Sequence, residues 1–148
     1  MLIDTVKKLF LRDLKKLRVE IESYQQEANI WQIQDAISNS AGNLCLHLIG
    51  NLNTYIGAEL GNTGYIRNRE LEFSAKNISR EELFQKIDTT IDVVENTLNH
   101  LTPEKLPEEF PVLVFAEKTS IEYMLIHLTT HLGYHLGQIN YHRRLLDK

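Results

Sequence analysis

The sequence predicts an all-α protein, a four-helix bundle with a long crossover between its second and third helices (up-down-down-up). Four stretches place apolar residues three and four positions apart, two of them start with capping motifs, and the links between them differ in length. With 148 residues, 43% of them hydrophobic, the chain suffices for one ordinary core but not for two. We therefore expect a single domain over residues 1–148.

The first two helices are predicted by the spacing of their apolar residues. The first covers roughly residues 2 to 28, and its apolar positions are Ile3, Val6, Phe10, Leu14, Leu17, Ile21 and Tyr24. The second begins near Ser38 or Ser40, both of which can cap a helix, and stops at Gly61-Asn62. Its apolar positions are Ala41, Leu44, Leu48, Leu52 and Tyr55. Both stripes are expected to face a shared core.

The third and fourth helices carry clearer start signals. Residues 79–82, Ser-Arg-Glu-Glu, form a capping box, and the helix that follows ends before Thr102-Pro103. Residues 119–122, Thr-Ser-Ile-Glu, form the same kind of motif, and the last helix runs down to Leu146. Both helices keep the spacing of an amphipathic face.

The links between helices indicate the topology. About ten residues join the first two helices, which favours antiparallel neighbours. Roughly 18 residues, 61–78, join the second and third; extended, they could span about 59 Å, more than a helix of ~33 Å, so these two helices can be parallel. The last link contains the apolar run 112–115, which either pairs as a strand or covers one end of the bundle.

Composition excludes several classes of function. A net charge of −4 offers no basic footprint for nucleic acid. The longest apolar stretches, such as 44–49, fall well short of the roughly 20 residues of a membrane span. The amino terminus, with Asp4, Lys7 and Lys8, lacks the apolar core of a secretory signal. The single Cys45 is expected to be a core thiol, and we expect a cytoplasmic protein.

A histidine pair in the last helix suggests the chemistry. His131 and His135 lie one turn apart beside the apolar stripe, where an unpartnered imidazole would cost roughly 1 to 3 kcal/mol. Such a pair alone is more often a surface or satisfied core pair. However, the second helix offers His47 at the edge of its stripe, flanked by Asn43 and Asn51. We therefore predict that His47, His131 and His135 hold one divalent metal ion.

The remaining histidines receive other interpretations. His127 precedes His131 by one turn, but three successive turns fan too widely for one ion, so we interpret it as a packed or second-shell residue. His100 and His142 are interpreted as ordinary residues near helix ends. Asn51 and Gln138 are candidate second-shell or substrate contacts.

Several metal and catalytic classes lack their parts. Leu132 follows His131, so the glutamate base of an H-E-x-x-H protease is missing, and no Glu-x-x-His pair for a di-iron centre occurs. Glycine-rich phosphate motifs and a G-x-S-x-G nucleophile are also absent. Nor do we expect a carboxylate base near the three histidines.

The pattern His131-x-x-x-His135-x-Gly137-Gln138, with a lone His47 on the second helix, resembles the DinB-like metal-binding proteins over most of the chain. The resemblance implies a four-helix bundle with parallel second and third helices, a metal held by the three matching histidines, and frequent homodimers. Residues 67–73 resemble a segment of one uncharacterised branch. Leu136 departs from the arginine or threonine frequent before the glycine, which removes a polar contact beside the site.

Characterised proteins of this kind include transferases and isomerases that use low-molecular-weight thiols such as bacillithiol or mycothiol. Three neutral imidazoles leave coordination positions open, and a cation there stabilises a thiolate. The leading hypothesis is metal-assisted transfer of a thiol cosubstrate onto an electrophilic small molecule; hydrolysis would use the same ligands. The rival is a non-catalytic, metal-stabilised bundle acting through dimerisation or partner binding. Imidazole ligands suit zinc, nickel, iron or copper.

Overall fold

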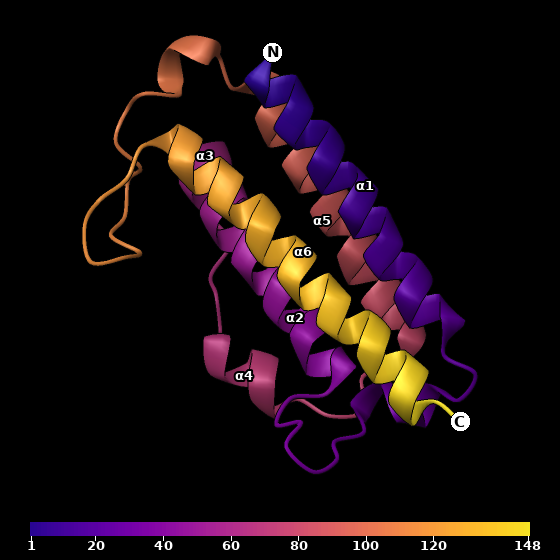
Figure 1. Ribbon diagram of the computed structural model, residues 1–148. Coiled ribbons are helices and arrows are strands. Elements are labelled where there is room, and N and C mark those ends of the chain that lie inside the picture. Colours follow the sequence, from indigo (N-terminus) through magenta and orange to yellow (C-terminus); the bar gives the residue numbers. More distant parts are fainter.

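The four main helices pack side by side as a bundle (Figure 1). The computed structural model describes residues 1–148 and contains no strands. The chain runs in one direction in α1 (Leu2–Ser23) and α6 (Ile121–Leu146), and in the opposite direction in α2 (Ala41–Leu52) and α5 (Arg80–His100). The parallel pair α2 and α5 gives the up-down-down-up order, so the predicted fold class is confirmed. No helix combines the length and apolarity of a membrane span.

Helix α1 ends earlier than the predicted residue 28. Tyr24 leaves the helix with a ψ of 126°, and its carbonyl accepts a hydrogen bond of 2.8 Å from Arg80 Nη2. A short 3₁₀ turn, η1 (Glu27–Trp31), follows and buries Ile30 and Trp31 against the core. The apolar spacing of the sequence continues past residue 23, which is why a longer helix was predicted. In the structure the backbone turns after Ser23, and this turn brings Ile30 and Trp31 into the core.

The second helix starts at Ser40 and not at Ser38. The Ser40 hydroxyl accepts from the backbone N–H of Asn43 at 3.1 Å. After α2 the helix continues through a π-helical segment, η2 (Asn53–Ala58), and a last turn, α3 (Glu59–Gly61). Within this stretch the Thr54 hydroxyl donates to the carbonyl of Gly50 at 2.7 Å, a side-chain bond that competes with the regular helix ladder. The predicted stop is confirmed: Asn62 adopts the left-handed conformation at φ 51°.

The caps of the last two helices lie at or next to the predicted positions. Ser79 caps α5 by accepting from the N–H of Glu82 at 3.2 Å, as the capping box predicts. Helix α6 is capped by Ser120, whose hydroxyl accepts from the N–H of Tyr123 at 3.0 Å. The cap is therefore one residue later than the predicted Thr119.

The crossover contains a short helix that the sequence did not predict, α4 (Arg69–Ser74). Six residues are too few to show an apolar period. Asn68 caps α4, and the Asn43 amide of α2 donates to the carbonyls of Glu72 and Ala75 at 2.9 and 2.8 Å. Helix α4 thus lies against α2 (Figure 1), and every residue of α2 is buried.

The apolar run 112–115 forms no strand; the last link contains a short 3₁₀ turn, η3 (Pro103–Lys105), and an isolated bridge between Glu109 and Ser120. Val112, Val114 and Phe115 are partly buried against the core, which agrees with the covering alternative. Cys45 is fully buried, and burial raises the pKa of its thiol to about 12, so the prediction of a core thiol is confirmed.

Candidate metal centre

Three histidine rings converge between α2 and α6. Ring nitrogens of His47, His131 and His135 lie within 4.8 Å of one another, so one ion could be held by all three. His47 Nε2 lies 3.2 Å from His131 Nε2. Two nitrogens bound to one tetrahedral ion at ~2.0 to 2.1 Å would be about 3.3 Å apart. The structure therefore brings together the three residues that the sequence selected; metal binding itself stays a prediction.

The surroundings of His131 and His135 favour the neutral form of these two rings. His47 is 7% exposed, and His131 and His135 are half-buried. Burial, reinforced by the neighbouring histidines, lowers the pKa of His131 to about 4. Burial also lowers the pKa of His135, although its hydrogen bond to Gln138 opposes the change. A neutral imidazole is the form that binds a metal, so these two rings are ready for a ligand role at neutral pH.

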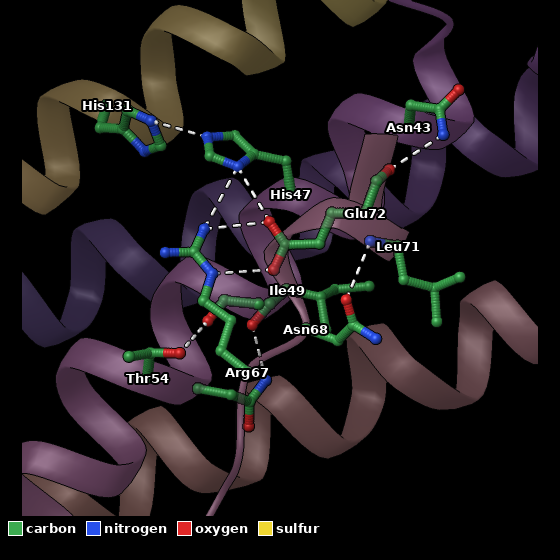
Figure 2. Close-up of polar contacts among 11 residues, drawn as sticks. Asn43, His47, Ile49, Thr54, Arg67, Asn68, Leu71, Glu72 and His131 are labelled. Atoms are coloured by element: carbon green, nitrogen blue, oxygen red, sulfur yellow. Dashed lines mark hydrogen bonds and ion pairs between the residues drawn. The ribbon is translucent and has the colours of Figure 1, made fainter. Parts of the chain in front are cut away.

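A buried carboxylate lies behind His47, although the sequence offered no candidate carboxylate base near the three histidines. Glu72 Oε1 lies 3.1 Å from His47 Nδ1, on the opposite edge of the ring from Nε2 (Figure 2). Arg67 donates to the same carboxylate from Nε at 2.8 Å and from Nη2 at 3.0 Å. Burial raises the pKa of Glu72, but the bonds from His47 and Arg67 outweigh it and leave that pKa below its usual value.

Sequence reasoning missed Glu72 and Arg67 as partners of His47. Both fall within the segment 67–73, which the resemblance singled out without assigning it a role. Their approach to α2 depends on α4 and on the path of the crossover, and neither leaves a period in the sequence. The only residue-level signal was the pairing of Arg67 and Glu72 five positions apart.

Gln138 contacts the second ring of α6. Its Oε1 lies 2.7 Å from His135 Nδ1. Because an amide oxygen only accepts, His135 donates from Nδ1 and keeps the lone pair of Nε2 free. This is the contact that a second-shell residue makes; a part for Gln138 in substrate binding stays a prediction. Leu136 packs against the core and makes no polar contact there.

Two buried polar atoms near the centre have no hydrogen-bond partner. They are His131 Nδ1 and Asn51 Oδ1, and Asn51 lies one turn after His47 on α2 and is 7% exposed. An unpaired buried polar atom costs roughly 1 to 3 kcal/mol. Asn51 Oδ1 is an acceptor, and His131 Nδ1 becomes a donor if the imidazole proton lies on it.

His127 lies outside the cluster of three rings. It is half-buried and stacks on His131, with ring centroids 6.1 Å apart and planes 28° apart. The ring of Phe115, from the link before α6, packs against it with centroids 4.7 Å apart and planes 87° apart. These contacts are those of a packed residue, one of the two interpretations that the sequence left open, and a second-shell role for His127 stays a prediction.

The interpretation of His142 as an ordinary helix-end residue is wrong. It is 4% exposed, with Nδ1 2.6 Å from the Tyr24 hydroxyl and Nε2 2.7 Å from the carbonyl of Gln32. It therefore ties α6 to the turn after α1. His100, by contrast, is exposed at the end of α5 and contacts only the carbonyl of Asn96 at 2.8 Å.

A cavity of about 420 Å³ has His135 in its wall, but neither His47 nor His131. Its lining has no Asp, Glu, Lys or Arg. The other lining residues are Tyr134, Gln138, Tyr141, His142 and Leu145 of α6, Leu44 of α2, and residues 36–39. A larger, mostly polar hollow of about 1090 Å³ lies between the ends of α3 and α5 and includes none of the three histidines.

Comparison with known proteins places the whole bundle in one family. The family described as protein of unknown function (DUF1572) matches residues 2–148, which include all four helices and all three histidines. The chain belongs to the DUF1572 family. No curated protein matches this DUF1572 chain.

The donor set of this DUF1572 protein fits a transition-metal ion. Three neutral nitrogen ligands without a carboxylate suit zinc, nickel, iron or copper, whereas magnesium and calcium require oxygen ligands. The Nδ1 atoms of His47 and His135 face acceptors, which leaves each Nε2 available toward the centre. The residues present therefore fit a divalent zinc, nickel, iron or copper ion better than magnesium or calcium.

Proposed function

We propose that this protein is a metal-dependent enzyme that transfers a low-molecular-weight thiol onto an electrophilic small molecule. His47, His131 and His135 would hold the ion. The observation that carries the proposal is the cluster of three imidazoles, with no carboxylate in the set, next to a cavity that shares His135. The resemblance of the histidine pattern to DinB-like proteins supports the same reaction class.

The reaction has simple requirements. Three protein ligands leave coordination positions open, as in catalytic rather than structural sites. A divalent ion, when bound, supplies positive charge that stabilises a thiolate, the nucleophilic form of a thiol. The sulfur then forms a bond to the electrophilic atom, the leaving group departs with its bonding electrons, and the thiol proton passes to water. No free base is needed from Glu72, whose carboxylate is occupied by Arg67 and His47.

The cavity supports an uncharged electrophile. Its volume of about 420 Å³ lies within the ~300 to 1,000 Å³ of small-molecule sites, and its wall combines aromatic rings with a few neutral polar groups. Tyr134 and Tyr141 would supply the aromatic contacts to a planar group, and Gln138 offers an amide near His135. Homodimerisation and a cytoplasmic location stay predictions.

Turnover with defined reactants tests the proposal. Protein loaded with zinc or nickel is mixed with a low-molecular-weight thiol and 1-chloro-2,4-dinitrobenzene, and the thioether is followed by absorbance. We expect turnover that falls at least about 10-fold in His135→Ala and is unchanged in His100→Ala, an exposed histidine outside the site. Equal rates in the wild type and His135→Ala would contradict the proposal.

The non-catalytic alternative predicts a different pattern. A metal-stabilised bundle would lose stability steeply on chelation and would turn over no pair of thiol and electrophile. If this combination is found across a panel of thiols and neutral electrophiles, the enzymatic proposal is overturned, but the proposal of a metal site still stands.

A further inference from the structure

The structure assigns to Glu72, supported by Arg67, the role of positioning residue for His47: it fixes the proton of His47 on Nδ1 and so directs the Nε2 lone pair toward His131 and His135. This inference deepens the proposed function, since it concerns one ligand of the proposed metal site. Three observations support it. They are the direction of the hydrogen bond between Glu72 and His47, the contacts that hold α4 in place, and the lack of a side chain at Gly50.

The first feature is the direction of the hydrogen bond. A carboxylate only accepts, so the 3.1 Å contact between Glu72 Oε1 and His47 Nδ1 requires the proton on Nδ1. Arg67 Nη2 also lies 3.3 Å from Nδ1, but a guanidinium only donates. If Nδ1 accepted from Arg67, its lone pair would face the Glu72 oxygen at 3.1 Å, an unfavourable contact. The shorter contact and the carboxylate therefore decide the tautomer.

The second feature is how firmly α4 is held. A helix of six residues has little stability of its own, and this one is tied on three sides. Asn68 caps its start, and Arg67 donates to the Glu72 carboxylate from two nitrogens (Figure 2). The Asn43 amide donates to the carbonyl of Glu72 and to that of Ala75, the residue just after the helix. The ring of Phe73 also lies against His47, with centroids 5.0 Å apart. These ties place the carboxylate, which is 6% exposed, at one defined position.

The third feature is Gly50, three residues after His47 on α2. A Cβ at this position would collide with Glu72, coming within 2.6 Å of its Cδ. The carboxylate therefore lies directly over bare backbone, and any side chain at position 50 would displace it. Gly50 gives a way to move Glu72 without changing Glu72, Arg67 or His47.

A purely structural ion pair between Arg67 and Glu72 would tie the crossover to the bundle but would not affect the His47 ring. The two roles are separated by measuring the dissociation constant for zinc of the full-length protein. We expect zinc binding to be about 10- to 100-fold weaker in Glu72→Ala and Gly50→Ala. Glu72→Gln should lose less, because its amide oxygen can still accept from Nδ1.

Gly42→Ala is the matched control for the glycine variant. It lies on the same helix, and its Cβ would come within 2.6 Å of the Trp31 ring, whereas no Glu72 atom is among its nearest contacts. We expect it to be destabilised, with a zinc dissociation constant within about 2-fold of the wild type. Unchanged zinc affinity in folded Glu72→Ala or Gly50→Ala, or an equal loss in Gly42→Ala, overturns the positioning role.

Nitrogen-15 NMR of the histidine rings in metal-free protein gives a readout that needs no metal. We expect His47 to carry its proton on Nδ1 in the wild type and to become a mixture of tautomers in Glu72→Gln. A wild-type His47 with its proton on Nε2 overturns the inference even if a variant fails to fold. If zinc does not bind the wild type but the Nδ1 proton is found, the positioning stands and the proposed metal-dependent function fails.

Discussion

His47 Nε2 and His131 Nε2 face each other at 3.2 Å across the boundary between α2 and α6. Two bare lone pairs at this distance would repel, so one of the nitrogens carries a proton in the metal-free protein. When His47 is neutral and donates from Nδ1 to Glu72, the proton between the rings belongs to His131. The nitrogen that would contact a metal is therefore the one that holds this proton before the metal binds.

Metal binding should change the tautomer of His131. We expect its proton on Nε2 in the metal-free protein and on Nδ1 after saturation with zinc, because Nε2 must then provide its lone pair. Nitrogen-15 NMR of the ring nitrogens, before and after zinc, measures this directly. A His131 that keeps its Nε2 proton in zinc-saturated protein would exclude this nitrogen as a ligand.

Asn51 should matter only when metal is bound. Its Oδ1 is buried and unpaired, as is His131 Nδ1, and we expect Oδ1 to accept from His131 once the proton lies on Nδ1. We expect Asn51→Leu to retain or gain stability in the metal-free protein, since it removes an unpaired buried acceptor. Zinc affinity should fall about 10-fold. Thermal unfolding in chelator and zinc titration check the two parts, and an unchanged dissociation constant would show that Asn51 does not serve the site.

Bound metal should stabilise the bundle through α2 and α6 together. At a free zinc concentration 100 times the dissociation constant, linkage predicts a gain of about 2.7 kcal/mol in the free energy of unfolding. Denaturant unfolding with and without zinc measures this gain. His131→Ala should abolish it, while His127→Ala should keep it, because His127 lies outside the cluster of three. Loss of the gain in both variants would place His127 among the ligands.

Acid should destabilise the protein partly through the protonation of His142. Burial lowers the pKa of His142 below its ordinary value of 6.5, although the bond to the Gln32 carbonyl opposes this. Below pH 6.5 the unfolded chain takes up a proton that the folded chain refuses, so stability falls as the pH decreases toward the folded-state pKa. Tyr24 is the titratable group that faces His142.

The variant His142→Gln isolates this contribution. It should be less stable at neutral pH, because the hydrogen bonds to Tyr24 and Gln32 are altered, but its stability should depend less on pH below 6.5. Denaturant unfolding at a series of pH values compares the two slopes. Parallel slopes in the wild type and the variant would mean that His142 titrates with an unperturbed pKa.

The fold was predictable because its long helices carry local signals. Ser79 with Glu82, the stop at Asn62 and the apolar stripes all act within a few residues of the chain. The early end of α1 was not predictable, because Tyr24 leaves the helix to meet His142, which is 118 positions away. The burial of His142 was not predictable for the same reason, because its partners Tyr24 and Gln32 are distant in the sequence.

For the candidate site, the three histidines were predictable from the sequence, but the contacts of Glu72 were not. Two imidazoles one turn apart, and a third on a neighbouring helix, can be recognised from spacing, and the structure brings them together. The contacts of Glu72 depend on a six-residue helix and on the clearance at Gly50, which act through space. Periodicity carries no information about either.

The most direct test of the central claim is a cobalt(II) or zinc(II) titration of the purified protein, with stoichiometry and affinity measured in the wild type and in His47→Ala. We predict one ion per chain and a loss of affinity of about 100-fold or more in His47→Ala, since removal of a ligand should exceed the loss caused by an outer contact. A stoichiometry well below one, or equal affinity in His47→Ala, would contradict the claim that imidazoles from α2 and α6 share one metal ion.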